Sequence, residues 1–307
     1  MINIVSFLIC ASAFSVNGIG EDMSVFSMPF NDIGTLTRIQ FTFLPEFSVM
    51  REHGDSRSTF WTYRFRFYMA GPITRWLVLD GGNTERFDQS FDVYYEQDEL
   101  NLHVEAQGAV EEVYVGAGLR FGDINLALRG SYLFGTAQEL WNYSVANYVI
   151  VDTFMYQYRG QIFAVGARYR FLRCAYEFLG DYTAENTVDT LIELPSRLSV
   201  GIYHQFLGGD VALTAEHSFW QDTYRSPTRF KLAYAGDRIG FAYLYNPWYI
   251  DGVSEHGLDV SYALPIHRLG TITFELCSAL RSRSSLQEVK ISPRLVFTFD
   301  ELFTSRQ

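Results

Sequence analysis

Lysine is scarce in this chain of 307 residues: among 24 basic side chains only Lys231 and Lys290 are lysines, and the others are arginines. The basic residues are outnumbered by 35 acidic ones, which gives a formal net charge of −11. Proteins that recognise nucleic acids bind the phosphates with clustered Lys and Arg. The charge balance therefore argues against a nucleic-acid partner.

Long apolar runs and closely spaced cysteines are also missing. No run of about 18 apolar residues occurs, so a helical membrane protein is not expected. The three cysteines, Cys10, Cys174 and Cys277, lie far apart with no metal-ligand or redox spacing around them. We predict two isolated thiols in the mature chain, with a disulfide as the alternative, and neither a metal nor a cofactor.

Aromatic and apolar residues, in contrast, are abundant, at 17% and 48% of the chain. So much apolar surface is incompatible with a disordered chain. The length suits one large all-β domain or two smaller domains.

The first 20 residues contain an apolar stretch from Ile4 to Phe14 that is too short to span a bilayer but typical of a signal peptide. The alternatives are a first buried strand or a misplaced start codon. We predict a signal peptide over residues 1–20, a short N-terminal segment over 21–57 that forms a reduced hatch or a first strand, and a β-barrel over 58–307.

Apolar side chains recur at every second position through much of the chain, as expected of half-exposed β-strands. In WTYRFRFYM, Trp61, Phe65 and Met69 share one face, and Arg64 and Arg66 share the other. The same alternation recurs in at least nine windows. Turn signals such as Gly122-Asp123 join many of them closely, which predicts antiparallel hairpins.

Short connections alternate with longer polar or mixed stretches at 135–150, 181–195, 220–227 and 246–257. This alternation is typical of an outer-membrane barrel, which has tight turns at one rim and long loops at the other. Roughly 250 residues accommodate 12 to 14 strands at about ten residues per strand. We therefore predict an all-β, antiparallel transmembrane barrel; a secreted β-sandwich remains the alternative.

Composition favours the barrel over the sandwich. The apolar face is crowded with Phe, Tyr and Trp, as in the aromatic girdles of membrane barrels. The opposite face mixes small residues with Arg and Glu, which suits a confined interior where guanidinium groups pair with carboxylates. The predicted partners are the lipid bilayer and the outer-membrane assembly machinery of a diderm bacterium.

Two stretches resemble the FadL-type family of outer-membrane transport proteins, especially a divergent branch found in uncultured diderm bacteria. They are DGGNTERFDQSFDVYY, from Asp80 to Tyr95, and the Gly-rich segment from Val110 to Gly135, which ends in YLFG. The resemblance implies a barrel of 14 strands, a small N-terminal hatch and passage of hydrophobic molecules. The chain departs from the family pattern at the hatch, where only Pro29-Phe30-Asn31 is similar, and at its end, where Phe303 is followed by four further residues.

Catalytic machinery is not recognisable. The sequence has 6 His, but none stands in a pattern that would place it beside Asp or Ser on one wall. It has neither a phosphate-binding loop nor a nucleophile elbow. We therefore expect a protein that is not an enzyme, with no catalytic residues.

Charged residues on the polar faces of the predicted strands are the candidate functional groups. Two hypotheses remain open: they constrict the lumen and guide the head group of an amphipathic ligand, or they pair with each other and hold the wall together. The predicted lumen-lining residues are Arg120, Arg129, Arg168, Arg170, Glu112, Glu216, Glu275 and Arg294.

The sequence thus predicts an outer-membrane channel for passive passage of hydrophobic or amphipathic, fatty-acid-like small molecules. The alternative function is a barrel that does not transport and serves instead as a scaffold or surface interaction protein through its long loops.

Overall fold

The computed structural model describes residues 21–22, 37–52, 55–97, 100–145, 148–185, 194–220, 225–266, 270–284 and 286–300. The predicted signal peptide, Pro29-Phe30-Asn31 and the last seven residues of the chain lie outside these ranges. The described part is built entirely from strands, turns and short connections, and it contains no helix long and apolar enough to cross a bilayer.

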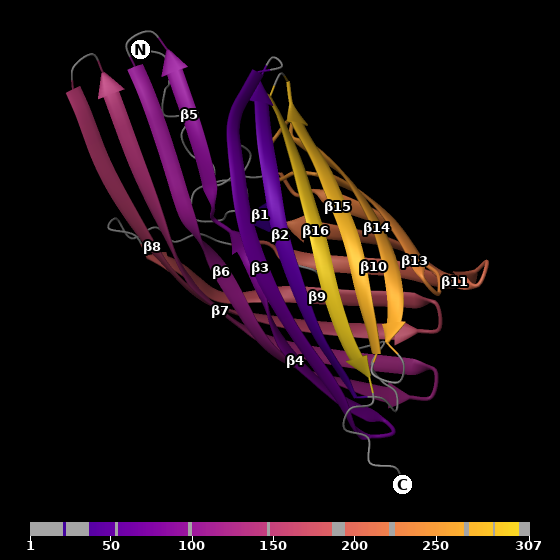
Figure 1. The fold of residues 1–307 in the computed structure, drawn as a ribbon. Helices are drawn as coiled ribbons and strands as arrows, with labels where there is room; N and C mark the ends of the chain where they lie inside the picture. The colour runs from indigo at the N-terminus through magenta and orange to yellow at the C-terminus, as the bar shows by residue number, and fades with distance from the viewer. Residues whose placement is uncertain are drawn as a thin grey trace.

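The strands form a single antiparallel sheet that curls into a barrel (Figure 1). Their bounds are β1 Glu21–Asp22, β2 Arg38–Glu52, β3 Asp55–Thr74, β4 Leu77–Asp88, β5 Phe91–Gln97, β6 Leu100–Phe121, β7 Ile124–Val145, β8 Tyr148–Tyr169, β9 Leu172–Glu185, β10 Ser196–Phe206, β11 Gly209–Phe219, β12 Thr228–Ala235, β13 Ile239–Pro247, β14 Ser254–Ile266, β15 Gly270–Arg283 and β16 Leu286–Asp300. A continuous antiparallel sheet matches the period-two alternation of the sequence.

The barrel closes at two places. β2 pairs with β16, which joins the first long strand to the last, and β4 pairs with β6 across the short β5. The closed circuit has 14 strands, as predicted. β5 pairs with the far end of β6, and β1 pairs with Phe87 and Asp88 of β4. Since β2 pairs with both β16 and β3, the wall includes Arg38–Glu52, and β3 joins it from Asp55.

Large apolar side chains point outward from the wall. Val115, Phe121 and Leu128 are exposed by 69%, 57% and 57%, while Ala127 and Leu133 on the opposite face are buried. One closed sheet with an apolar exterior contradicts the alternative of two stacked sheets around a dry core. The outward band of aliphatic and aromatic side chains is the surface that a transmembrane barrel shows to lipid.

The two rims of the barrel differ. Tight turns at 75–76, 122–123, 170–171 and 207–208 lie at one end, here called the turn rim. At the other end, here called the loop rim, β9 ends at Glu185, β10 begins at Ser196, and residues 248–253 connect β13 to β14. In bacterial barrels the short turns face the periplasm. The prediction of a loop at 135–150 was wrong. β7 continues to Val145 and β8 begins at Tyr148, because the polar residues of this segment still pair with each other as a projecting hairpin.

Candidate functional site

The pairing between β3 and β4 ends partway up the wall. The register runs from Thr74–Leu77 near the turn to Phe67–Asn83, and no pairing of Asp55–Arg66 with β4 or β5 occurs among the described residues. At its end, the backbone N–H of Phe67 donates to the side-chain oxygen of Asn83 at 3.1 Å. We call the interrupted boundary between β3 and the β4–β5 segment the seam.

Beyond Asn83, the end of β4 becomes buried on both faces. Glu85, Arg86, Phe87 and Asp88 have exposures of 6%, 3%, 2% and 3%. The register with β6 shifts between Glu85 and Phe87, which places a β-bulge at Arg86. Bulges bend a strand and redirect its side chains. A strand with lipid on one side would keep an exposed face, so this end of β4 has turned into the barrel interior.

The strand breaks at Gln89-Ser90, and β5 then continues beside β6. The carboxylate of Asp88 accepts the backbone N–H of Ser90 at 2.9 Å, the local Asp turn that often ends a regular element. The N–H of Gln89 donates to the carbonyl of Gly108 at 3.0 Å, so β6 holds the break in place.

Two glycines let β6 and β7 bend at the same height. Gly108 and Gly135 have φ values of 149° and 159°, which side-chain-bearing residues rarely adopt. A Cβ on Gly108 would lie 2.3 Å from the carbonyl oxygen of Thr136, and one on Gly135 would lie 2.0 Å from that of Ala109. The inward turn of β4 and the bend in the wall behind it therefore depend on both glycines.

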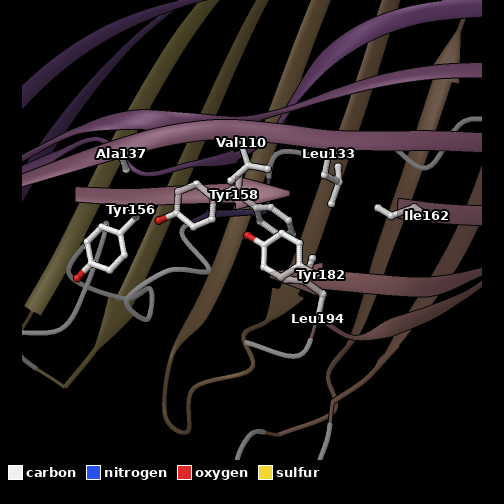
Figure 2. Close-up of a cluster of buried hydrophobic side chains, with 9 residues drawn as sticks. Val110, Leu133, Ala137, Tyr156, Tyr158, Ile162, Tyr182 and Leu194 are labelled. Atoms are coloured by element: carbon white, nitrogen blue, oxygen red, sulfur yellow. The ribbon is translucent and has the colours of Figure 1, made fainter. Parts of the chain in front are cut away.

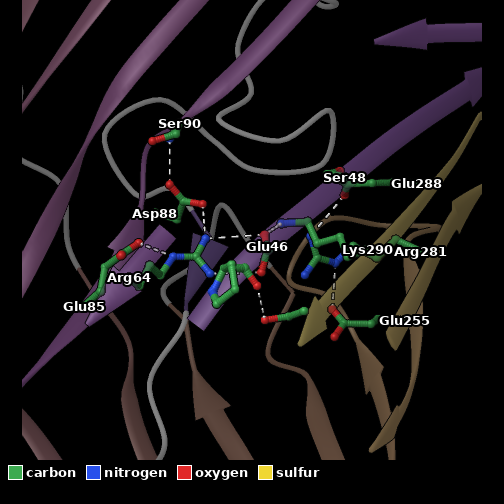
Figure 3. A network of polar contacts seen from close by, with 12 residues as sticks. Glu46, Ser48, Arg64, Glu85, Asp88, Ser90, Glu255, Arg281, Glu288 and Lys290 are labelled. Carbon is green, nitrogen blue, oxygen red and sulfur yellow. Dashed lines mark hydrogen bonds and ion pairs between the residues drawn. The ribbon is translucent and has the colours of Figure 1, made fainter. Parts of the chain in front are cut away.

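Arg64 bridges the seam from the inner face of β3 (Figure 3). Its Nε donates to Glu85 at 2.9 Å, and its terminal nitrogens donate to Asp88 and, at 2.9 Å, to Glu46 of β2. Side-chain ion pairs thus connect β3 to β4 where the backbone ladder has ended. The guanidinium fork suits this position because it reaches three carboxylates at once.

The contacts continue around the wall from Glu46 to β14 (Figure 3). Lys290 of β16 donates to Glu46 at 3.0 Å, and Ser48 of β2 donates to Glu288 of β16 at 2.8 Å. Arg281 of β15 pairs with Glu288 at 3.0 Å and with Glu255 of β14 at 2.8 Å. These contacts extend the same set of buried ion pairs over neighbouring strands. We call the set the seam network; its members are Glu46, Ser48, Arg64, Glu85, Asp88, Glu255, Arg281, Glu288 and Lys290.

A second group of ion pairs crosses the interior. Arg86 of β4 contacts Glu112 of β6 at 3.4 Å and Glu177 of β9 at 2.8 Å, although β7 and β8 separate those strands in the wall. Glu177 also pairs with Arg197 of β10 at 2.8 Å, and Arg197 is fully buried. The cross-lumen network consists of Arg86, Glu112, Ser131, Glu177, Arg197, Glu216 and Arg229. Three guanidinium groups face three carboxylates, so the network is balanced in charge.

An apolar cluster, drawn in Figure 2, adjoins this network through Phe87, whose ring centroid lies 5.4 Å from the guanidinium carbon of Arg86. Phe87, carried inward by β4, packs with Val110, Leu133 and residues from β8 and β9. Tyr158 stacks between Tyr156 and Tyr182 with ring centroids 6.3 Å apart on each side. The interior therefore combines an aromatic, apolar region with buried, paired charges.

The predicted lumen-lining residues occupy different surroundings. Glu112 and Glu216 are buried in the cross-lumen network, Arg129 lies 3.7 Å from the ring centroid of Tyr114, and Arg294 is 3.7 Å from Glu275. Arg120 and Arg168 share the inner face near the turn rim. Arg170 is in the β8–β9 turn, where it pairs with Asp123, both being 63% exposed. The turn explains its position, because the strand ends at Tyr169.

Sequence reasoning missed the residues at the centre of the two networks. Arg64 was placed on a polar face but not selected, and Arg86, Glu177, Arg197 and Arg281 were not selected at all. The period-two pattern could identify which of these face inward. It could not reveal that β4 leaves the wall and brings Arg86 to β9.

No group of three or more metal-ligating side chains occurs among the described residues. No protein-family model matches the sequence, and no curated protein is similar to it. Solved structures, however, share the architecture.

The structure is similar to the Pseudomonas putida toluene transporter TodX, with 11% identity, a TM-score of 0.59 and coverage of 93% of this chain and 96% of that one. It is similar to the CymD monoaromatic hydrocarbon channel, with 11% identity, a TM-score of 0.53 and coverage of 92% and 94%. A Pseudomonas aeruginosa FadL homologue gives 8% identity, a TM-score of 0.53 and coverage of 86% and 89%.

The closed sheet, its apolar exterior and its charged interior define a transmembrane β-barrel of the bacterial outer membrane. Within that class, the chain has the fold of the FadL-type transporters, as the resemblance in its sequence predicted.

Proposed function

We propose that this barrel is a passive channel for hydrophobic or amphipathic small molecules, with the seam as the route between the interior and the bilayer. The observation that carries the proposal is the end of the β3–β4 ladder at Phe67–Asn83, within the apolar outer band. Phe65 of β3 and Val113 of β6 lie on the outer surface near the end of this ladder, and they are exposed by 42% and 44%.

The interior favours a lateral route over an axial one. Arg86 and Glu177 join β4 to β9 across the interior, and Arg197 is buried behind them. Crossing this level along the axis would require a solute to separate desolvated ion pairs, which is costly. At the seam the backbone ladder between β3 and β4 has ended, so a solute has to displace only the side-chain contacts of Arg64 with Glu85 and Asp88, and the adjacent apolar cluster around Phe87 offers a compatible surface.

The transport known for the structural neighbours supports the proposal: TodX is a toluene transporter and CymD a monoaromatic hydrocarbon channel. The substrate of the present chain is proposed only as a class. Fatty-acid-like amphiphiles fit it, because the same interior offers both apolar surface and guanidinium groups.

The channel is tested by uptake of a labelled hydrocarbon into liposomes that contain the purified protein. We expect uptake above that of empty liposomes. Phe65→Asn places an amide on the outer face of β3 beside the seam, and it should lower uptake severalfold. Phe241→Asn is the control and should leave uptake unchanged, because Phe241 has a similar exposure of 44% but lies on β13, where it is paired on both sides. Equal effects of the two variants would refute the lateral route, and uptake equal to that of empty liposomes would refute the channel.

A scaffold or surface interaction role remains the second candidate, and one observation favours it. At the tip of the β7–β8 hairpin, Tyr148, Val149, Ile150 and Val151 are exposed by 77%, 71%, 56% and 55%. A contiguous exposed apolar patch of this kind marks interaction surfaces. Replacing these four residues by Ser leaves hydrocarbon uptake unchanged if the channel is the function of the protein.

A further inference from the structure

The β7–β8 hairpin leaves one strand edge without a backbone partner at the loop rim. β8 pairs with β7 from Tyr148 onward, whereas its ladder with β9 begins only at Gln157, opposite Glu185. Among the described residues, no strand pairs with the other edge of Tyr148–Tyr156. Figure 1 shows this part of β8 as the outermost strand of the projecting hairpin. We call Tyr148–Tyr156 the β8 edge.

The β8 edge has none of the features that usually protect an exposed strand. Its nine residues, YVIVDTFMY, include no Lys, Pro or Gly, and the only charge is that of Asp152. Natural sheets protect their edges with charges, prolines and bulges, because unpaired N–H and C=O groups recruit other chains. At about 3.3 Å per residue the edge is about 30 Å long, which is sufficient for a complete added strand.

The adjoining connection between β9 and β10 is too short to cover the whole edge. Residues 186–193 join Glu185, the last residue of β9, to Leu194, which packs in the interior cluster of Figure 2. Both ends of the connection are therefore fixed at the base of the β8 edge. At about 3.6 Å per residue the connection can extend about 16 Å before it must return, which reaches only the level of Asp152. Tyr148–Val151 lies beyond this limit.

A second copy of the chain in the same membrane does not fit the β8 edge either. Barrels inserted in the same sense are related by an axis along the membrane normal, so their equivalent strands rise in the same direction. A symmetric antiparallel pair of two β8 edges would require the two copies to point in opposite directions. The edge therefore suits a strand from another protein.

The side chains of the β8 edge define the strand that would fit. Ile150 and Phe154 flank Asp152 on one face, and Val149 and Val151 lie on the other, because successive side chains alternate. Asp152 is exposed, and it forms no ion pair with any residue that the structure describes. Opposite charges directly across a strand pair stabilise it, and like charges destabilise it. A complementary strand therefore has apolar residues at alternate positions and a Lys or Arg opposite Asp152.

We propose that the β8 edge binds an extended segment of another protein by β-strand addition on the outer side of the membrane. The short turns of such barrels face the periplasm, which places the loop rim outside. In this mode of recognition, main-chain hydrogen bonds supply affinity and alternate side chains supply specificity. The inference is independent of the proposed channel, because the β8 edge belongs neither to the seam nor to the cross-lumen network.

The test measures binding of the fluorescent peptide VTVTKTVTV to the purified protein in lipid nanodiscs that hold one barrel each. The peptide places Lys opposite Asp152 and Val at the other positions of that face. Fluorescence anisotropy should show about threefold to tenfold tighter binding of this peptide than of VTVTETVTV, whose central charge is reversed. Asp152→Lys should reverse the preference. Asp123→Lys is the matched control: it changes the net charge equally but lies at the turn rim, so it should keep the wild-type preference.

Alternate N-methylation of the peptide separates strand addition from adsorption to an apolar patch. In an added strand, the amides of one alternate set point toward β8 and those of the other set point away. Methylation of one set should therefore abolish binding, and methylation of the other set should leave it intact. Equal binding of the two methylated peptides would overturn the proposal.

The remaining outcomes are equally decisive. Absence of peptide binding by the folded wild type, or the same charge preference in the wild type and in Asp152→Lys, would refute strand addition. Clustering of liposomes that carry the protein, without peptide binding in nanodiscs, would assign the β8 edge to a second copy in an opposing membrane. Retained mobility shifts on boiling verify that each variant is folded. Hydrocarbon uptake should be unchanged in Asp152→Lys, so failure of this proposal is distinguishable from failure of the channel.

Discussion

The two sides of the barrel wall are built differently. From Ile124 to Val145, β7 has a paired residue on β8 at every position, and the ladder is continuous over 22 residues. On the other side, β3 and β4 pair only as far as Phe67–Asn83, and Arg64, Glu85 and Asp88 then connect the strands through their side chains. A backbone ladder is independent of side-chain identity, whereas the seam depends on a few particular residues. The seam is therefore the part of the wall that single substitutions can alter.

The largest expected effect comes from the bend in β6 and β7 behind the seam. Gly135→Val should prevent assembly, because its Cβ would collide with the carbonyl of Ala109 at a φ of 159°. The measurement is the gel-mobility shift on boiling of membrane fractions. Gly130→Ala is the control on the same strand, where the nearest atoms lie 3.9 Å away, and it should assemble normally. Normal assembly of Gly135→Val would mean that the bend is not required.

The next effect concerns the cross-lumen network. Arg197→Met should lower the free energy of unfolding by about 3–5 kcal/mol, since it leaves Glu177 and Glu216 buried with one guanidinium partner fewer. Urea unfolding in lipid vesicles measures the change. A loss below about 1 kcal/mol would show that the network is hydrated or rearranges.

Substitutions of Asp88 separate the two roles of that residue at the seam. Asp88→Asn removes the charge that faces Arg64 but keeps an oxygen for the N–H of Ser90, and it should cost about 1.5–3 kcal/mol of unfolding free energy. Asp88→Ala removes both contacts, so it should cost about 0.5–2 kcal/mol more, by analogy with the loss of a helix cap. Equal losses in the two variants would exclude a contribution from the turn at Ser90.

The smallest effect is expected at the turn rim. Arg170→Gln breaks the pair with Asp123, in which both side chains are 63% exposed, and should change the unfolding free energy by about 0–1 kcal/mol because water and salt screen it. A loss as large as that for Arg197→Met would contradict the distinction between exposed and buried ion pairs.

Much of the wall could be predicted from local sequence. The alternation around Val113–Phe121 correctly separated the outward from the inward side chains, and Gly122-Asp123 correctly indicated a tight turn. The resemblance around Arg86-Phe87-Asp88-Gln89 correctly indicated the fold. The predicted loop at 135–150 failed because the polarity of a segment does not show whether it pairs with a neighbour outside the membrane.

The candidate site could be predicted only in part. Glu112, Glu216 and Arg168 were predicted from alternation to line the lumen, but Arg173, which stands opposite Arg168, was not predicted. Register between strands is set by turn geometry and by the whole sheet, so a single strand does not reveal which charges become neighbours.

The sequence alone determined that this chain forms antiparallel strands with one apolar and one polar face, because period two in hydrophobicity is a property of each strand by itself. Tertiary structure decided that the polar face encloses an interior, that β4 bends into it and that Arg86 meets Glu177 from a distant strand. These features depend on closure, bulges and register, which arise only when all the strands pair at once.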